Sequence, residues 1–327
     1  MFICCSWMIF ITGCNNNDKQ AFPYDEILNQ KPFAPLTDSI RQFPSNDELW
    51  FRRAVLLNSN NLPEPALADF KKAWSLKKEE RYALGISTLL LEKKPDSAIL
   101  FLNTALTDLP ESFLLRLSLA RSYGESGKTV NALDICNQVL AKNPQQVDIL
   151  KLKADLLDKT GNVAEATATL ENAYKITPFD VELNYILALR YAEAKNPKVL
   201  ALCDSLQKAD SAGTHAEPYY YKGIYYSNIK DNTKALALFD EAVKHDYNFL
   251  DGYIEKGSIL FDMKKYNDAL AVFNLALTIS PQFADAYYWI AKCQEATGKK
   301  EEAKANYQRA YSLDNALKEA KEAADRL

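Results

Sequence analysis

The sequence predicts an all-α chain built from stacked helical hairpins. Small residues recur 34 positions apart within one helical register, in two runs of three: Ala98, Ala132 and Ala166, then Ala235, Ala269 and Ala303. A second series follows seven residues behind: Ala105, Val139, Ala173, Ala242, Ala276 and Ala310. Small side chains at such points let neighbouring helices approach closely. A fixed period of this kind indicates similar units stacked in one direction, which present a continuous surface for binding.

One segment shows the unit most fully. Residues 252–281 read GYIEKGSILFDMKKYNDALAVFNLALTISP, and this segment resembles the tetratricopeptide repeat. The matching positions are Tyr253, Gly257, Tyr266, Ala269, Phe273, Ala276 and Pro281. The next unit repeats the pattern with Tyr287, Ala291, Gly298, Ala303, Tyr307 and Ala310. Prolines recur at the end of the unit, where they stop the second helix: Pro44, Pro110, Pro144, Pro178 and Pro281.

The resemblance covers residues 36–327 and implies a right-handed superhelical solenoid of about eight repeats. The expected repeats are 47–78, 79–112, 113–146, 147–180, 181–215, 216–249, 250–283 and 284–315. Residues 316–327 follow as a capping helix, with Leu317, Ala320, Ala324 and Leu327 on one face and charges on the other. Such a helix covers the apolar side of the last repeat while it meets water.

The fifth repeat departs from the pattern. It has Leu200 and Gln207 where small residues belong, so we expect its two helices to pack more loosely. One extra residue follows in the link at 211–218, which resets the spacing to 35. Coupling between neighbouring repeats is therefore expected to be weakest here, so that the array bends or unfolds as two blocks, residues 36–210 and 216–327.

The N-terminus is typical of an exported protein. Its first fourteen residues carry no charge and are too few to span a bilayer, but they suit the apolar core of a signal peptide. Ile11-Thr12-Gly13-Cys14 resembles a bacterial lipobox. That resemblance implies a signal peptide at 1–13, lipid on Cys14 and a stable membrane anchor, with residues 14–35 as a tether. The alternatives are an ordinary secretory signal and a buried N-terminal strand.

Composition and motifs argue against several classes of function. The net charge of −4, with Lys and Arg spread among acids, offers no footprint for nucleic acid. The two histidines, His215 and His245, have no partners at metal-ligand spacing. The chain has no P-loop, no GxGxxG and no GxSxG motif, so we predict no enzymatic activity, no cofactor and no metal. Cys136, Cys203 and Cys293 lie in separate repeats, which does not suggest disulfides.

The candidate binding residues lie on the first helix of each repeat. In tetratricopeptide proteins this helix lines the concave groove, and its second and fifth residues commonly point into it. The fifth positions are Phe51, Ala83, Leu117, Lys151, Tyr185, Tyr220, Ile254 and Tyr288. The acidic second positions are Glu48, Glu80, Asp148, Glu182, Glu217, Asp251 and Asp285. We therefore expect a floor of apolar and tyrosine side chains with an acidic edge, and candidate binding residues Tyr185, Tyr220, Tyr288, Lys151 and Phe51.

The tyrosine floor and the acidic edge also have a purely structural explanation. The helix dipole favours acidic residues in a first turn without any ligand. Tyrosines at helical spacing can simply pack between hairpins, although tyrosine is also a favoured anchor at protein interfaces.

The expected partner is a protein or peptide. Lys151 faces Asp155 and Asp158 one turn along, and neighbouring repeats lack a matching basic pair, so a C-terminal carboxylate ligand is disfavoured. A positively charged or amphipathic segment suits the surface better. The leading hypothesis is a lipid-anchored scaffold in the bacterial cell envelope, where Asn15, rather than Asp, after the lipidated cysteine favours the outer membrane. The alternative is an envelope subunit that binds a solute or a glycan.

Overall fold

The computed structural model describes residues 24–327 and confirms the all-α prediction. This part of the chain contains nineteen helices and no strand. It divides into two compact units, one ending at Val139 and the other spanning Leu140–Leu327. Cys14, the expected signal peptide and the first part of the expected tether lie outside the described residues.

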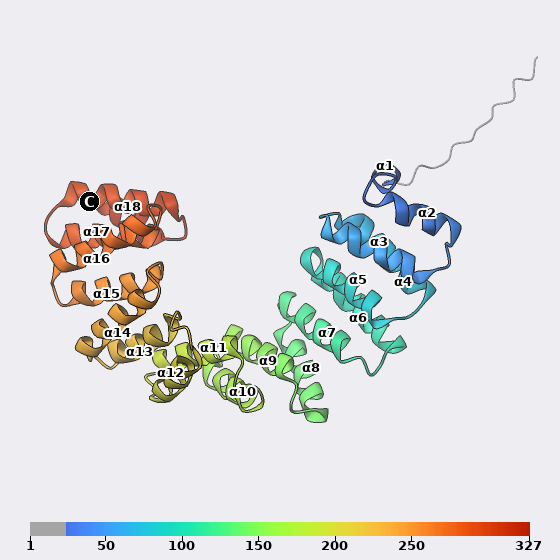
Figure 1. The fold of residues 1–327 in the computed structure, drawn as a ribbon, viewed down its shortest axis with the longest axis horizontal. Coiled ribbons are helices and arrows are strands. Elements are labelled where there is room, and N and C mark those ends of the chain that lie inside the picture. Colours follow the sequence, from blue (N-terminus) through green and yellow to red (C-terminus); the bar gives the residue numbers. More distant parts are fainter. Residues whose placement is uncertain (1–23) are drawn as a thin grey trace, which may run out of the picture. The chain divides into compact units, whose positions relative to one another are not determined.

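The first unit consists of consecutive helical hairpins, shown from blue to green in Figure 1. Its helices are α1 (Asp25–Leu28), α2 (Ala34–Gln42), α3 (Asp47–Ser59), α4 (Pro63–Leu76), α5 (Glu80–Lys93), α6 (Pro95–Asp108), α7 (Phe113–Glu125) and α8 (Thr129–Lys142), the last of which extends past the boundary between the units. Helix α3 packs against α4 and α5 against α6, while α4 packs against α5 and α6 against α7. Each expected repeat from residue 47 onward thus holds two helices.

The N-terminal end of the first unit is packed from α1 onward. Phe33 and Ile40 are buried, and the Thr37 hydroxyl donates to the carbonyl of Leu28 over 2.7 Å. The buried guanidinium of Arg53 donates to both carboxylate oxygens of Asp69 over 2.6 and 2.9 Å and to the Thr37 hydroxyl over 3.0 Å. The expected tether at 14–35 is therefore wrong over residues 24–35, because α1 and the start of α2 belong to the packed array.

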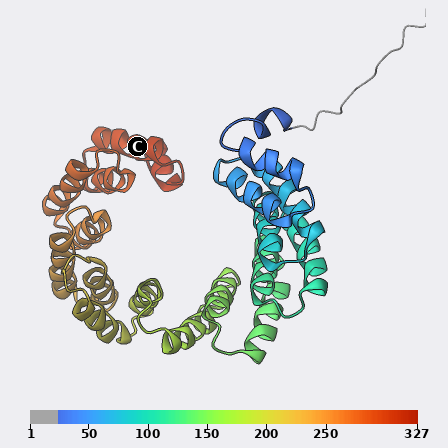
Figure 2. The ribbon, with the colours of Figure 1, turned by 45° about the vertical axis from the view of Figure 1, so that its right-hand side comes forward.

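The second unit continues the same hairpins, shown from green to red in Figures 1 and 2. Its helices are α9 (Val147–Lys159), α10 (Val163–Ile176), α11 (Val181–Glu193), α12 (Lys198–Ala209), α13 (Glu217–Asn228), α14 (Asn232–His245), α15 (Leu250–Asp262), α16 (Tyr266–Ile279), α17 (Ala284–Ala296), α18 (Lys300–Leu313) and α19 (Lys318–Arg326). First helices of successive repeats contact one another, α11 with α13, α13 with α15 and α15 with α17.

Glycines explain how closely the paired helices approach. An added Cβ at Gly223 would lie 2.6 Å from the Phe239 ring, and one at Gly257 would clash with the Phe273 ring. Both phenylalanines are fully buried. The small residues predicted in the repeat register are therefore the points where an aromatic side chain of the second helix meets the backbone of the first.

The fifth repeat corrects the sequence register. Helix α12 buries Val199, Leu202 and Cys203, whereas Leu200 and Gln207 are only half-buried. A tight first turn, in which the amide of Val199 donates to Asn196, moves the buried position one residue earlier than predicted. Clefts flank α12 on both sides, about 220 Å³ beside α10 and α11 and about 390 Å³ beside α13 and α14. The clefts are in keeping with the looser packing expected there.

The link after α12 is held by its own polar contacts. The Asp210 carboxylate accepts hydrogen bonds from the amides of Gly213 and His215, and the bond from His215 is the main reason that its pKa falls to about 2. Lys222 on α13 contacts Asp204 and donates to Gln207 over 2.7 Å, so it joins α13 to α12. The compact units divide at 139/140. The expected weak coupling at the link, with bending or unfolding as blocks 36–210 and 216–327, stays a prediction.

The C-terminal helix covers the last hairpin as the sequence predicts. Ala320, Ala323 and Ala324 of α19 are buried beside α18, with Leu317 and Leu327 packed at the margin. Arg326 forms an ion pair of 2.6 Å with Glu295 of α17. Apolar contacts and one cross-helix ion pair therefore hold the cap in place.

Candidate functional site

Four successive first helices of the second unit carry one group of tyrosines and carboxylates. We call this group the tyrosine–carboxylate face; its members are Tyr185, Glu217, Tyr220, Tyr221, Asp251, Glu255 and Asp285, on α11, α13, α15 and α17. Because these helices pack side by side, residues at equivalent positions of each helix lie along one surface.

The tyrosines of this face contact one another edge to face. The ring centroids of Tyr185 and Tyr221 lie 5.9 Å apart, and those of Tyr221 and Tyr220 lie 5.7 Å apart. Tyr220 also packs at 5.1 Å against Phe249 and at 5.8 Å against Phe239. Such contacts fix the rings in place. Tyr220 is thus both a surface residue and a part of the sixth repeat's core.

The tyrosine hydroxyls lie among carboxylates. The Tyr185 hydroxyl donates to Glu217 over 3.5 Å, at the limit of a hydrogen bond. Burial raises the pKa of Tyr221 to about 12, with smaller contributions from Glu217 and Asp251. Burial likewise raises the pKa of Tyr220, with contributions from Glu255 and Asp251. These phenols therefore stay protonated and can donate hydrogen bonds to a ligand.

The carboxylates of this face have no cationic partners. Among residues 24–327, no Lys, Arg or His side chain forms an ion pair with Glu217, Asp251, Glu255 or Asp285. Burial raises the pKa of Glu255, and the neighbouring Asp251 raises it further. Burial also raises the pKa of Asp285, with Asp314 and Asp251 adding to the effect. A cation placed beside these groups would favour their ionised forms, because no other cation compensates their negative charge.

Tyr288 lies in a neighbouring cleft at the C-terminal cap. The cleft holds about 500 Å³ and is lined by α17, α18 and α19, with Phe261 of α15. The Lys292 ammonium in it lies 4.0 Å from the Trp289 ring centroid and 5.5 Å from that of Tyr288. Arg326 and Glu295 pair across one side of the cleft. The structure therefore gives Tyr288 a more polar setting than that of Tyr185 and Tyr220.

Lys151 makes different contacts from those expected. Its ammonium lies 2.7 Å from Asp180, which caps α11 at the end of the same repeat, and 3.3 Å from Glu182 of the next repeat. The predicted contacts with Asp155 and Asp158 are wrong, because Arg190 of α11 pairs with Asp158 instead. Since Lys151 is already neutralised, it offers little charge to an anionic ligand.

Phe51 belongs to the first unit, where its ring is covered. Its centroid lies 5.1 Å from that of Tyr82 and 5.9 Å from that of Phe70. The Arg81 guanidinium lies 4.7 Å from the Phe51 centroid. These contacts make Phe51 a residue of the interface between repeats rather than an open floor.

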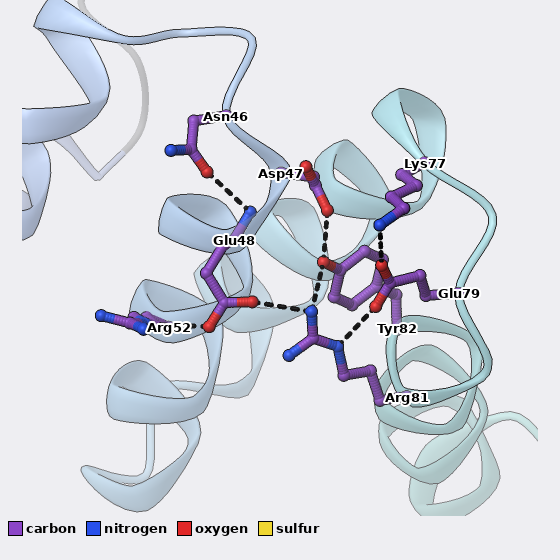
Figure 3. Close-up of polar contacts among 8 residues, drawn as sticks. All are labelled: Asn46, Asp47, Glu48, Arg52, Lys77, Glu79, Arg81 and Tyr82. Carbon is purple, nitrogen blue, oxygen red and sulfur yellow. Dashed lines mark hydrogen bonds and ion pairs between the residues drawn. The ribbon is translucent and has the colours of Figure 1, made fainter.

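The acidic residues around Phe51 are neutralised within the first unit (Figure 3). We call this group the arginine-bridged edge; its members are Asp47, Glu48, Lys77, Glu79, Arg81 and Tyr82. Arg81 lies 2.7 Å from both Glu48 and Glu79, and Glu48 also pairs with Arg52 over 2.9 Å. Tyr82 donates to Asp47 over 2.5 Å. The hydrogen bonds from Lys77 and Arg81 lower the pKa of Glu79.

The sequence alone did not single out Tyr221 and Glu255. Both occupy the sixth position of their first helix, next to the fifth position, where the candidate binding residues lie. The run of three tyrosines at 219–221 was the available signal, since consecutive residues on a helix cannot all face the core.

The tyrosine–carboxylate face offers groups that can bind a ligand. Residues 24–327 contain no group of three or more His, Cys, Asp or Glu side chains placed to hold a metal ion. Within the same range, no helix combines the length and the apolar character needed to cross a membrane. Aromatic rings beside unpaired carboxylates are suited to recognising a cationic ligand.

Paired antiparallel helices with buried small residues place the chain among helical-repeat proteins. Comparison with family models agrees: residues 124–190 and 284–317 match models described as tetratricopeptide repeat, and residues 257–298 match one described as TPR repeat. The chain therefore carries tetratricopeptide repeats, as the resemblance implied.

Curated relatives match only in part. The chain is 26% identical over 188 residues to anaphase-promoting complex subunit 7 of Mus musculus, covering 55% of this chain and 32% of that protein. It is 30% identical over 114 residues to heat shock protein STI1 of Saccharomyces cerevisiae, covering 34% of this chain and 19% of that protein. The chain thus spans a third or less of the length of these relatives.

Two solved structures share the fold. A tetratricopeptide repeat protein from Parabacteroides merdae aligns with a TM-score of 0.59 at 20% identity, over 74% of this chain and 96% of that one. The C-terminal part of a TPR repeat-containing protein from Cytophaga hutchinsonii aligns with a TM-score of 0.51 at 18% identity, over 75% of this chain and 99% of that one. At these identities the likeness establishes the fold alone.

Proposed function

We propose that this protein is a non-enzymatic scaffold that binds another protein through the tyrosine–carboxylate face. Tetratricopeptide folds typically mediate protein–protein interaction, which makes this the natural class of function. The observation that carries the proposal is the set of partly buried carboxylates without cations, placed beside tyrosines whose rings are held by their neighbours. Interface anchors are commonly such rigid aromatic residues.

The chemistry of this face favours a basic segment that also carries apolar side chains. Lysine or arginine of the partner would pair with Glu255 and Asp285 and favour their ionised forms. The tyrosine rings would contact the aliphatic stems of these residues or flanking apolar side chains. Charge complementarity of this kind gives specificity and speeds association.

Photo-crosslinking in the cells that make the protein tests this assignment. A photoreactive phenylalanine analogue in place of Tyr185 should capture a partner protein. The same residue in place of Val163, which is 56% exposed on α10 of the same unit, serves as the matched control. Equal capture from both positions, or capture from Val163 alone, would move the binding surface away from the tyrosine–carboxylate face.

We further propose that the scaffold is a lipid-anchored protein of the bacterial cell envelope, attached to the outer membrane. The support is the lipobox-like sequence that ends at Cys14. A Cys14→Ser variant should lose its lipid and move from the membrane fraction to the soluble fraction. Intact-mass measurement of the mature protein decides the matter, since an unmodified Cys14 would exclude the anchor.

A solute- or glycan-binding envelope subunit is the second candidate. The cleft of about 500 Å³ around Tyr288 favours it, because its size and its mixture of aromatic and charged side chains suit a small polar ligand. A single Tyr288→Ala change should abolish binding of a small ligand. A protein partner makes many more contacts, so the same change would weaken its binding only in part.

A further inference from the structure

A cleft of about 440 Å³ lies in the first unit, away from the arginine-bridged edge. It runs between the two second helices α4 and α6, above the C-terminal part of α5. Its lining residues are Pro63, Glu64, Leu67, Lys71, Leu89, Leu90, Lys93, Lys94, Ser97 and Phe101. The volume is within the usual range for small-molecule sites, roughly 300–1,000 Å³.

The floor of this cleft is apolar. Leu89 is buried, while Leu67, Leu90 and Phe101 are half-buried and open toward the cleft. Phe101 packs edge to face against Trp74 at 5.9 Å, which fixes its ring. An aliphatic chain would bury this surface favourably, at roughly 25 cal/mol per Å².

The rim of the cleft is basic. Lys93 pairs with Glu64 over 2.6 Å across one end. Lys71 and Lys94 also line the cleft, and neither pairs with a carboxylate among the residues that the structure describes. Glu64 is the one acidic side chain in the lining, and Lys93 neutralises it. Two positive charges therefore stay uncompensated around an apolar floor.

We propose that this cleft binds a single aliphatic chain with an anionic head group, of the class of long-chain carboxylates. The apolar floor would take the chain, and Lys71 and Lys94 would take the head group. The volume favours a small amphiphile over a helical peptide, because two turns of helix about 10 Å across occupy about 800 Å³. The charge on the rim favours an anion over a cation.

Titration calorimetry of the full chain with dodecanoate, below its critical micelle concentration, tests the proposal. We expect saturable binding of one dodecanoate per chain. Dodecyltrimethylammonium has the same chain with the opposite charge and should bind about tenfold more weakly or worse. The double variant Lys71→Glu, Lys94→Glu should reverse this preference. Both lysines are exposed, so the exchange leaves the core unchanged.

A second variant tests the floor. Leu90→Glu places a carboxylate among the apolar side chains and should abolish dodecanoate binding. Leu238→Glu, in the cleft beside α12 of the second unit, is the matched control and should leave binding unchanged. Circular dichroism verifies that each variant is folded. If Leu90→Glu does not fold, the double lysine variant alone tests whether dodecanoate binds in this cleft.

Several results would overturn the proposal. Dodecanoate that shows no saturable binding would do so, as would equal binding of the two amphiphiles or unchanged binding after the exchange of both lysines. An acidic amphipathic peptide that displaces dodecanoate and binds more tightly would make the cleft a protein-docking site instead.

Discussion

The acidic residues on the first helices of the two units differ in their electrostatic surroundings. In the first unit, Arg81 neutralises Glu48 and Glu79, and the pKa of Glu79 falls. In the second unit, Glu255 and Asp285 have no cation, and their pKa values rise. Acidic residues on first helices therefore join a closed polar network around Arg81 in the first unit and lack a cation at Glu255 and Asp285 in the second.

One position of the repeat contributes to this difference. Arg81 is the third residue of its repeat, where later repeats have only uncharged residues: Leu115, Ile149, Leu183, Pro218, Gly252 and Ala286. Without a cation at that point, a first-turn carboxylate depends on another helix for its partner, as Glu182 does on Lys151.

The largest effect is expected where the first unit buries its own ion pair. Arg53→Ala leaves Asp69 buried without its cation, and breaking such a pair costs roughly 3–5 kcal/mol. Hydrogen exchange should show lost protection in α2, α3 and α4 and unchanged protection in α13 to α18. Equal loss in both units would mean that the array unfolds as one block and that the division at residue 139 has no energetic meaning.

A smaller effect is expected from the tyrosines of the second unit. Tyr185→Ala combined with Tyr221→Ala removes two rings that contact each other, and interface anchors of this kind contribute about 2 kcal/mol or more to binding. Partner recovery in a pull-down should fall at least tenfold, in proportion to that energy. Phe51→Ala in the first unit is the comparison variant and should leave recovery unchanged in the folded fraction.

The pH dependence of stability should have opposite sign in the two units. The folded-state pKa of Glu255 lies above its ordinary value of 4.5, so folding loses stability as pH rises from 4.5 through that raised value. Glu255→Gln should therefore raise the melting temperature at pH 7 and leave it unchanged at pH 4. The pKa of Glu79 is lowered, so its ionised form contributes stability above pH 4.5 that is lost on acidification.

Thermal melts of Glu79→Gln complete this test. Its melting temperature should fall slightly at pH 7 and match the parent chain at low pH. The effect is small because this carboxylate is on the surface. A fall at pH 7 for both variants would show that Glu255 has a cationic partner in solution.

The fold was predictable because it depends on small and aromatic residues at fixed spacing. Ala98, Gly257 and Phe273 each lie where two helices pack closely, and their spacing can be seen in a single sequence. The register of α12 was not predicted: Leu200 and Gln207 stood out as departures from the pattern, but the sequence did not show that Val199 takes the buried position instead. Periodicity detects repeats but not a local change in turn geometry.

The candidate site was predictable only in part, because its character depends on contacts between repeats. Tyr185 and Tyr220 follow from their positions in the helix. The pairing of Lys151 with Asp180 does not, because Asp180 caps a different helix, α11, and several acids were within reach. The absence of a cation beside Glu255 is likewise a property of the packed helices and not of any one of them.

The most direct test of the unsatisfied second-unit face is a titration with a labelled peptide of alternating lysine and leucine, followed by fluorescence anisotropy. The double variant Glu255→Gln, Asp285→Asn is compared with the matched pair Glu48→Gln, Glu79→Gln. We expect the second-unit variant to bind the peptide at least about tenfold more weakly and the first-unit variant to bind it as the parent chain does. Equal weakening in both variants, or weakening in the first-unit variant alone, would contradict the assignment of the binding face to the second unit.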